Sequence, residues 1–411
     1  MVSRNRFFEN ILHKVEEIPN NPTLSQKGIL NSFANPQINQ SNFTIFKESS
    51  LSETSSLIIN GNYKRTVSPE NKFRPFYSRD KVTPEETSQQ LKGIPIVFMK
   101  NSDPTNGVNC EEYRKLVKNI THLLTHSKIS IFNIDNYKML KQIGEGSYGI
   151  IYLVEEKYTH KKCALKKIIA HDYDEVKVFL NEFSLVYSIK HPNVMKIYDI
   201  CVRVLDTTTI AINVLMEMAN LDWDSDIIRH IDKNVKYTEK EIINILKQLV
   251  NALSYLQENK ISHRDIKPQN ILIYRHGVFK VADFGEAKEV KILKQLNTVR
   301  GTELFMSPIL YNSLRQNCDD VKHNPFKSDV FSLGYCFLYA TTLNYKIILD
   351  IRDLNDMKQI ELIVKECLNH YFSSKLIYCL LKMIEVHEDE RFDFIQLKNY
   401  INEHFNEDDI N

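Results

Sequence analysis

Two short motifs in the second half of the chain carry acidic and amide side chains at spacings that suit phosphoryl chemistry. The first is His263-Arg264-Asp265-Ile266-Lys267-Pro268-Gln269-Asn270, and the second is Asp283-Phe284-Gly285. One carboxylate of such a set can accept the hydrogen bond of an attacking hydroxyl, while an amide and a second carboxylate supply the oxygen ligands that Mg²⁺ prefers. The two motifs together predict a metal-assisted transfer site.

A glycine-rich segment lies upstream, at Gly144-Glu145-Gly146-Ser147-Tyr148-Gly149. Alone, this spacing is shared by dinucleotide-binding folds and by loops that cover nucleotide phosphates. A dinucleotide-binding fold needs a helix after the loop, whereas Ile150-Ile151-Tyr152-Leu153-Val154 has the β-branched pattern of a strand. The segment therefore predicts a flap inside a hairpin, whose backbone amides cover phosphates. A plain glycine-rich turn is the alternative.

A lysine in the next strand pattern, Cys163-Ala164-Leu165-Lys166, completes the set. Because side chains alternate along a strand, Ala164 and Lys166 share one face. The small Ala164 leaves room for a flat base, and the Lys166 ammonium can reach phosphate oxygens. A lone lysine in a strand is more often a solvated edge residue, but its place shortly after the glycine-rich segment favours phosphate binding.

Longer apolar patterns predict the elements that hold these motifs. Thr238 and Glu241 form a capping-box sequence, and the apolar residues that follow keep to one helix face. An uncharged run from Val330 to Tyr345 is shorter than the roughly 20 residues of a membrane span and predicts a buried helix. Residues 110–127 carry one apolar stripe, which we expect to pack against the following domain rather than bind a partner.

In their order along the chain, these motifs resemble those of the eukaryotic protein kinase family, Ser/Thr type. The resemblance implies an α+β, bilobal protein-kinase-like fold over residues 137–405. It has a β-rich N-lobe (137–217), a hinge (217–220) and an α-helical C-lobe (221–405). It also implies that the protein transfers the γ-phosphate of MgATP to Ser/Thr hydroxyls of protein substrates, with ATP and Mg²⁺ bound between the lobes.

The family pattern assigns the nucleotide-binding residues. The three flap glycines would cover the phosphates, and Lys166 would bind phosphate oxygens and pair with Glu182. Glu175 is the less favoured partner for Lys166. Met216 would guard the rear of the pocket. The base would lie between apolar walls and the backbone of the hinge, at Ile143, Ile151, Ala164, Glu217, Met218, Ala219 and Leu272.

The same pattern assigns the transfer chemistry. Asp265 would be the catalytic base, Lys267 would stabilise the transferring phosphoryl group, and Asn270 and Asp283 would hold magnesium. Lys267 is typical of Ser/Thr kinases. Thr302, in Gly301-Thr302, would orient Asp265.

A regulatory position follows from the same resemblance. Thr298 falls where the family carries its activating phosphorylation, by an upstream kinase or by autophosphorylation. Arg264 and Lys288 would bind the phosphate through charge-assisted hydrogen bonds. An unmodified loop threonine is the alternative.

Two features depart from the family. Ile309 stands where an activation-segment glutamate normally pairs with a C-lobe arginine, for which Arg391 is the counterpart. A buried arginine without a partner is costly, so Arg391 must find another acceptor or stay exposed. Gln269 and Tyr339 stand where kinases that favour arginine upstream of the target carry glutamate. We therefore expect no strong preference for basic substrates.

Composition excludes several classes of protein. Lys plus Arg is 53 and Asp plus Glu is 52, so charge gives no case for nucleic acid or an anionic membrane as partner. The seven cysteines include no C-x-x-C pair, which predicts reduced thiols in a cytoplasmic or nuclear, intracellular setting. Residues 1–107, rich in Asn, Ser, Gln and Pro, predict a mostly disordered tail, and 108–136 an amphipathic helix and linker.

Two alternatives to an active enzyme remain open at this stage. A pseudokinase-like scaffold or regulatory binding protein is favoured only by the missing glutamate at Ile309. A small-molecule kinase of related fold is disfavoured by the activation segment that ends in Gly301-Thr302, because this segment builds a peptide-binding ledge in the family.

Overall fold

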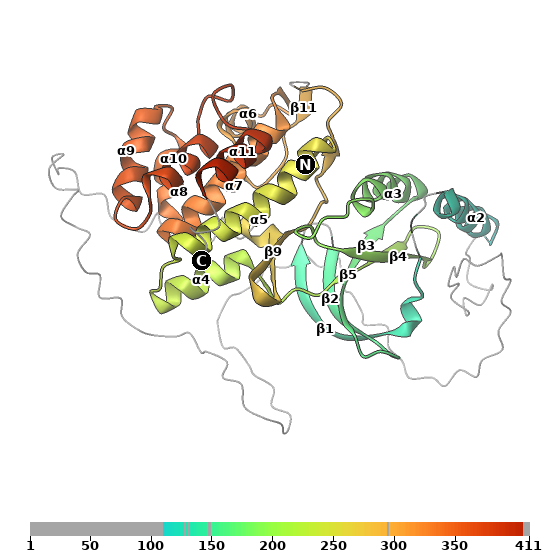
Figure 1. The fold of residues 1–411 in the computed structure, drawn as a ribbon. Coiled ribbons are helices and arrows are strands. Elements are labelled where there is room, and N and C mark those ends of the chain that lie inside the picture. Colours follow the sequence, from blue (N-terminus) through green and yellow to red (C-terminus); the bar gives the residue numbers. More distant parts are fainter. Residues whose placement is uncertain (1–109, 127–128, 130, 147–148, 294–295, 406–411) are drawn as a thin grey trace, which may run out of the picture. The chain divides into compact units, whose positions relative to one another are not determined.

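The computed structural model describes residues 110–126, 129, 131–146, 149–293 and 296–405. All of them belong to one compact unit. The predicted tail, 1–107, lies outside the described residues, as do Ser147 and Tyr148 of the predicted flap. Figure 1 shows a sheet-rich lobe joined to a helical lobe, and the bilobal α+β fold implied by the family resemblance is confirmed.

The N-lobe is built on an antiparallel sheet of five strands in the order β1-β2-β3-β5-β4. Its strongest β-branched and apolar pattern lies in β5, of which every residue but the last is buried. Bulges in β1 shift its register between Met139 and Lys141 and again between Gln142 and Gly144. The strands are β1 Tyr137–Gly146, β2 Gly149–Glu156, β3 Lys162–Ala170, β4 Ile197–Val204 and β5 Ile210–Glu217.

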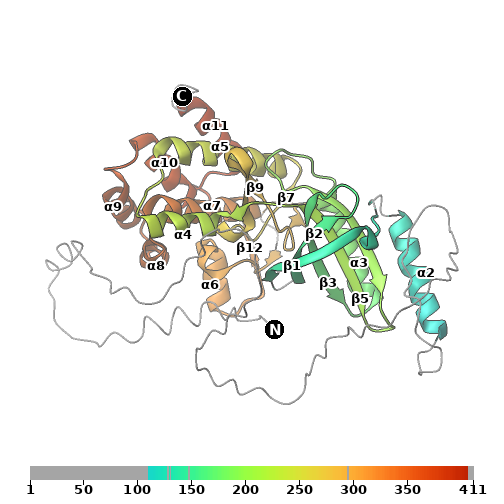
Figure 2. The same cartoon turned by 90° about the horizontal axis from the view of Figure 1, so that it is seen from below.

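Helix α3 (Tyr173–Tyr187) covers this sheet, and α2 (Cys110–His126) packs beside α3 at the edge of the lobe (Figures 1 and 2). Asp172 caps α3 by accepting a hydrogen bond from the Glu175 amide at 2.8 Å. The apolar stripe of α2 packs into the N-lobe core together with α3. The buried residues of the two helices in this core are Val117, Ile120, Leu124, Val176, Leu180 and Phe183.

The C-lobe is a helical bundle around the long helices α5 (Glu239–Glu258) and α7 (Pro325–Thr342). The capping box predicted for α5 is present, with Thr238 and Glu241 bonded reciprocally. The other helices are α4 Trp223–Lys233, α6 Pro308–Arg315, α8 Lys346–Arg352, α9 Met357–Leu368, α10 Ser374–Met383 and α11 Phe394–His404.

Short strands and single 3₁₀ turns connect the helices and carry the motifs. The strands are β6 Leu221–Asp222, β7 Ile261–Ser262, β8 Ile271–Tyr274, β9 Val278–Val281, β10 Lys288–Glu289, β11 Leu296–Thr298 and β12 Asp320–Lys322. The turns are η1 Ile134–Asn136, η2 Pro268–Asn270, η3 Arg275–Gly277 and η4 Glu303–Phe305.

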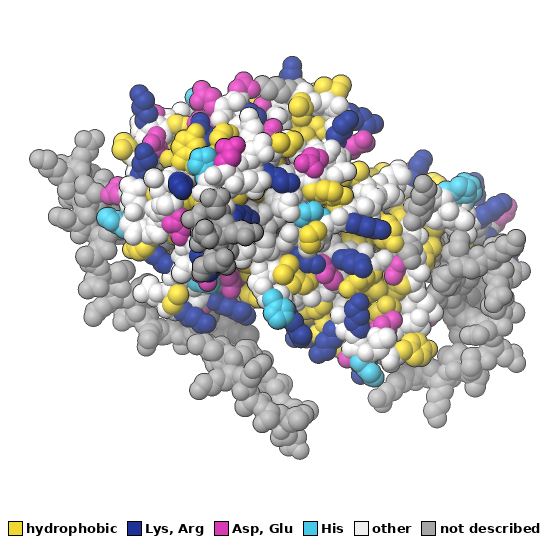
Figure 3. All heavy atoms as spheres, in the orientation of Figure 1, with side chains coloured by type: hydrophobic (Ala, Val, Ile, Leu, Met, Phe, Trp, Pro, Cys, Tyr) yellow, Lys and Arg dark blue, Asp and Glu magenta, His cyan; other side chains and the backbone are white. Residues whose placement is uncertain are grey.

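The uncharged run from Val330 to Tyr345 lies inside α7 as far as Thr342, and this helix is buried almost throughout. Gly334 allows this burial, because a Cβ atom there would lie 2.6 Å from a methyl group of Ile384 and 2.9 Å from Met383 Cβ. None of the helices in the described ranges combines the length and apolar character that crossing a bilayer requires. On the face shown in Figure 3, Lys and Arg side chains are interspersed with Asp and Glu.

Candidate active site

The catalytic loop is anchored to the C-lobe core by Asp329, a carboxylate of α7 with 3% of its surface exposed. It accepts hydrogen bonds from Ser262 Oγ (2.8 Å) and from the backbone amides of His263 (2.8 Å) and Arg264 (2.9 Å). Arg264 has a left-handed backbone, with φ of 68°. A non-glycine residue rarely adopts this conformation, so these bonds stabilise a strained turn.

No motif assigned from the sequence gives Asp329 a role. The signal that could have found it is a single carboxylate at the start of an otherwise apolar buried helix. Burial raises the pKa of Asp329 above its ordinary value, against the opposing effects of His263 and of the hydrogen bonds that it accepts. A buried carboxylate that accepts several hydrogen bonds is a common device for fixing a loop.

His263 joins the catalytic loop to the start of the second motif. Its Nε2 lies 2.9 Å from the carbonyl oxygen of Ala282, while its Nδ1 accepts a 3.3 Å bond from the Asp265 amide. This pair of contacts assigns the proton of the neutral imidazole to Nε2. The ring also packs on Phe284, with centroids 4.9 Å apart. The two motifs are therefore held as one structure.

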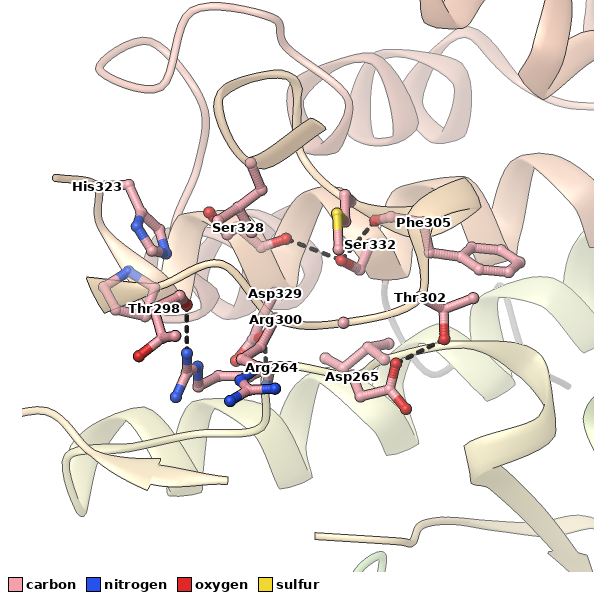
Figure 4. A pocket seen from close by; sticks show the side chains of 15 residues that line it. Arg264, Asp265, Thr298, Arg300, Thr302, Phe305, His323, Ser328, Asp329 and Ser332 are labelled. Carbon is pink, nitrogen blue, oxygen red and sulfur yellow. Dashed lines mark hydrogen bonds between the residues drawn. The ribbon is translucent and has the colours of Figure 1, made fainter. Parts of the chain in front are cut away.

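Asp265 lies at the centre of a group of polar side chains. Oδ1 accepts a 2.7 Å hydrogen bond from Thr302 Oγ1, and Oδ2 lies 2.8 Å from Lys267 Nζ (Figure 4 draws the bond to Thr302). Lys267 Nζ also donates to Thr302 Oγ1 at 2.8 Å. Burial raises the pKa of Asp265, but the charge of Lys267 and the hydrogen bonds from Lys267 and Thr302 outweigh it, so the pKa is below its ordinary value.

Glycine is required where the activation segment approaches this loop. Gly301 has φ of 116°, and a Cβ atom there would lie 2.8 Å from the carbonyl oxygen of Arg264. A larger residue would clash with the backbone and strain its own conformation. The glycine therefore lets Thr302 reach Asp265.

Asn270 is 7% exposed and is oriented by the same carboxylate. Its Nδ2 donates to the Asp265 carbonyl oxygen (2.8 Å) and to Asp265 Oδ2 (3.0 Å). Because both bonds use the amide nitrogen, the amide oxygen is the atom that can bind a metal. Asp283 supplies a carboxylate nearby in the fold, from a left-handed residue with φ of 54°.

This donor set fits Mg²⁺, which takes oxygen ligands and is commonly held by one or two carboxylates together with substrate phosphates. In the part of the chain that the structure describes, no three His, Cys, Asp or Glu side chains form a cluster that could hold a metal by themselves. The oxygens of Asn270 and Asp283 suit a metal that shares its coordination with phosphate.

Lys166 extends from β3 to the second motif. Its Nζ lies 2.7 Å from Asp283 Oδ1, and 14% of its side chain is exposed. A cation for phosphate and a carboxylate for metal therefore lie at one point. Glu182, its predicted partner, lies in α3, but its side chain is outside the described residues. The alternative, Glu175, instead accepts the His171 amide at 2.7 Å and closes the start of α3.

The residues predicted to bind the base lie in one apolar cluster. Ala164 on β3 pairs with Met216 on β5, and both are buried. Around them pack Ile151, Met218 and Leu272. These residues come from both lobes.

Ile143 lies on β1 with 38% of its surface exposed. Gly144 and Gly149 pack in the β1–β2 hairpin, and the backbone of Gly146 pairs with Gly149. The Glu217 carboxylate pairs with Lys280 at 2.8 Å and accepts the Lys196 amide at 2.6 Å. Glu217 therefore offers the pocket its backbone alone.

Thr298 lies on β11, which pairs antiparallel with β12, a strand that no pattern in the sequence predicts. Thr298 lies opposite Asp320, and its carbonyl oxygen accepts a 2.5 Å bond from Arg264 Nη2 (Figure 4). Lys288, the other predicted cation, is exposed on β10. The structure thus brings Thr298 to Arg264 through the backbone, and phosphorylation of Thr298 stays a prediction.

The sequence profile of the protein kinase domain matches residues 137–401. The chain belongs to the protein kinase family. Kinases of this family generally use ATP and Mg²⁺. The match includes the glycine-rich hairpin, the catalytic loop and the activation segment, so the geometry described above belongs to a kinase domain.

Curated relatives of this kinase match it over part of its length. Serine/threonine-protein kinase 36 of Pongo abelii is 32% identical over 213 residues, 50% of this chain and 14% of the relative. Cyclin-dependent kinase 9 of Xenopus tropicalis is 34% identical over 167 residues, 39% of this chain and 44% of the relative. The printed name of the first agrees with the Ser/Thr type predicted from Lys267.

The kinase satisfies Arg391 without the missing glutamate. Arg391 is 1% exposed, and its guanidinium donates to three backbone carbonyl oxygens, those of Glu385 (2.6 Å), Lys327 (3.0 Å) and Val386 (3.1 Å). It also lies over the Phe331 ring, 4.8 Å from the centroid. Burial lowers the pKa of Arg391 to about 10, against the raising effects of Glu388 and Glu385. The guanidinium is therefore charged at neutral pH and has acceptors.

The two positions linked to basic preference differ in exposure. Gln269 is exposed beside the catalytic loop, whereas Tyr339 is buried in α7. Gln269 has no ionisable group, and burial raises the pKa of Tyr339 to about 12. Neither side chain therefore carries a negative charge near neutral pH. The absence of a strong basic preference stays a prediction.

Proposed function

We propose that this kinase is catalytically active and transfers the γ-phosphate of MgATP to Ser or Thr hydroxyls of protein substrates. The observation that carries the proposal is the group of Asp265, Lys267 and Thr302, in which each side chain contacts the other two within 2.8 Å. A scaffold has no need of a carboxylate held ionised at this place.

Each of these side chains has a task that its geometry suits. The Asp265 carboxylate, with its lowered pKa, accepts the hydrogen bond of the attacking hydroxyl and orients it. Lys267 stands beside that carboxylate and stabilises negative charge on the group that is transferred. Thr302 holds both in place and leaves its own segment next to the substrate.

The nucleotide end of the site rests on Lys166, Asn270 and Asp283. Lys166 binds phosphate oxygens, and the oxygens of Asn270 and Asp283 hold the metal, which when bound neutralises phosphate charge. The apolar cluster around Ala164 excludes water from the base.

The alternative is a pseudokinase-like scaffold. Its one supporting feature was the missing glutamate at Ile309, and Arg391 has other acceptors. We therefore favour the enzyme.

The test is transfer of radiolabelled phosphate from ATP to a generic protein substrate, with wild type beside Asp265→Asn and Lys166→Met. We expect transfer by wild type and background in both variants. Binding of a fluorescent ATP analogue gives a second readout, in which Asp265→Asn binds like wild type. Equal background transfer in all three proteins would overturn the proposal, and retained binding would then favour the scaffold.

We further propose that the protein is intracellular, either cytoplasmic or nuclear, and that its substrates are proteins. We also propose that Thr298 is phosphorylated by an upstream kinase or by autophosphorylation. The six cysteines whose side chains the structure describes have free thiols, in keeping with a reducing compartment. Mass spectrometry of active protein tests the modification, and Thr298 found always unmodified would remove that idea.

A further inference from the structure

Arg352, the last residue of α8, reaches the activation segment from the C-lobe. Its Nη2 donates to the carbonyl oxygen of Glu303, and its Nη1 donates to that of Leu304. The guanidinium lies over the Tyr311 ring of α6, 3.8 Å from the centroid. One side chain therefore joins three elements, namely α8, the turn η4 and α6.

The contacts depend on the shape of a guanidinium. Two adjacent N–H groups meet two consecutive carbonyls, and the flat face stacks on an aromatic ring, which a lysine ammonium cannot do at once. Burial lowers the pKa of Arg352 below its ordinary value, against the raising effects of Tyr335 and Tyr311. The hydrogen bonds and the ring contact of Arg352 must therefore offset the free-energy cost of removing its charge from water.

The carbonyls bound by Arg352 belong to the two residues that directly follow Thr302, the residue that bonds Asp265 and Lys267. Ser332 of α7 bonds the next carbonyl, that of Phe305, at 2.7 Å. In this chain Ile309 cannot form a pair with Arg391, so other contacts must hold the segment. Three successive carbonyls are held from the C-lobe side.

We propose that Arg352 is a positioning residue for the protein substrate: it fixes residues 303–304, and with them Thr302, in the arrangement that receives a substrate chain beside Asp265. This inference rests on the proposed kinase activity. Among the described side chains, the contacts of Arg352 involve neither the nucleotide-binding nor the catalytic residues, so its loss should affect the protein substrate and leave ATP unaffected.

The experiment compares Arg352→Lys with Arg315→Lys. Arg315 is a matched control, because it also lies over Tyr311, at 5.6 Å, but is largely exposed in a surface pair with Asp353. We expect Arg352→Lys to raise KM for the protein substrate by about tenfold, with KM for ATP within twofold of wild type. Arg315→Lys should match wild type in both.

Amide hydrogen exchange of residues 303–306 gives a readout that needs no catalysis. We expect faster exchange there in Arg352→Lys than in wild type or Arg315→Lys, with the increase confined to this segment. Unchanged exchange would overturn the inference, as would an equal rise of KM for ATP and for protein. If wild type transfers no phosphate, the proposed function fails, and exchange still decides whether Arg352 fixes the segment.

Discussion

The Asp265 carboxylate is fixed by hydrogen bonds and charge contacts from its neighbouring side chains. Thr302 Oγ1 takes one carboxylate oxygen, while Lys267 Nζ and Asn270 Nδ2 take the other. Each neighbour stabilises the ionised form and restricts its rotation. Both effects serve catalysis, because a base must be deprotonated and aimed before the hydroxyl arrives.

Replacement of Thr302 tests whether its hydroxyl orients the Asp265 carboxylate. We expect Thr302→Val to lower kcat by about 10- to 100-fold, because it removes both hydroxyl contacts while keeping the shape of the side chain. KM for ATP should stay within twofold, since Thr302 lies away from the base cluster. Steady-state kinetics measure both, and Thr302→Ser, which keeps the hydroxyl, should recover most of kcat. A Val variant as fast as wild type would contradict the assigned role.

The pH dependence of kcat tests whether Asp265 is ionised in the folded protein. A carboxyl whose folded pKa is lowered stays charged until the pH falls through that pKa, which for Asp265 lies below the ordinary value of an aspartate. We therefore expect no acid limb of kcat from Asp265 between pH 5 and pH 8. Lys267→Met removes the largest lowering influence while burial remains, so its acid limb should move to higher pH. A pH–rate profile of Lys267→Met that matches wild type on the acid side would contradict this.

At the scale of elements, long-range contacts decide which helices and segments stay together. Arg391 lies between α10 and α11 and binds a carbonyl of α7, and Arg352 ties α8 to η4. On the other lobe, α2 packs beside α3 and adds its buried side chains to the N-lobe core. These contacts carry measurable shares of the free energy of unfolding.

Replacement of Arg391 should be costly. Arg391→Met fills the volume but removes the guanidinium donor from three carbonyl oxygens in buried or part-buried contacts, each worth about 1–3 kcal/mol. We expect the free energy of unfolding to fall by about 3 kcal/mol or more in urea denaturation. Arg229→Met, at an exposed position of α4, is the matched control and should change it by less than about 0.5 kcal/mol. Equal effects of the two substitutions would show that Arg391 is not held as described.

Replacement on α2 tests its docking. Ile120 is 2% exposed in the N-lobe core, whereas its neighbour Asn119 is exposed. Ile120→Asp places a charge without a partner in that core, and we expect a loss of about 2–4 kcal/mol, limited by detachment of the helix. Asn119→Asp adds the same charge in water and should be neutral. Thermal unfolding of the pair measures the difference, and two neutral variants would contradict docking of α2.

At the scale of the whole described unit, the lobes have separate apolar cores. The C-lobe core is one large cluster, and the N-lobe sheet packs on two smaller ones. The clusters meet at a few residues, such as Val186 of α3 in the C-lobe core and Ala282 in an N-lobe core. Such weak sharing favours separate unfolding of the lobes.

Fluorescence of the single tryptophan can show whether the two lobes unfold separately. Trp223 is fully buried in the C-lobe, with Phe279 and Phe337 rings at 5.9 and 5.1 Å. In denaturant, we expect Ile120→Asp to lower the midpoint of an N-lobe transition seen by far-UV circular dichroism, while the midpoint of Trp223 emission hardly moves. An equal shift of both signals would show instead that the two lobes unfold as one cooperative unit.

The local motifs are where sequence and structure agree most closely. Asp265 and Asn270 are five residues apart, and the helical turn between them brings amide and carboxylate together by local geometry. The capping box at Thr238 and the buried face of α5 follow in the same way from the period of the helix. The order of these motifs along the chain, which resembles that of the kinase family, was sufficient to predict the bilobal fold.

Other contacts depend on how the chain returns to itself. Thr302 meets Asp265 across 37 residues, Arg352 reaches Glu303 across 49, and Arg391 reaches Lys327 across 64. The pairing of β11 with β12, and the choice of Asp329 as anchor of the catalytic loop, likewise depend on packed neighbours. A pattern of period 2 or 3.6 reports which face of an element is apolar, but not which distant element covers it.

The sequence by itself therefore determined the kinase family, the lobes and the identity of the candidate catalytic side chains. Only the tertiary structure decided how they are held, since burial of Arg391, Asp329 and Arg352 forces each to find hydrogen-bond partners. Those partners are mostly backbone groups, which every residue carries and which no side-chain motif can mark.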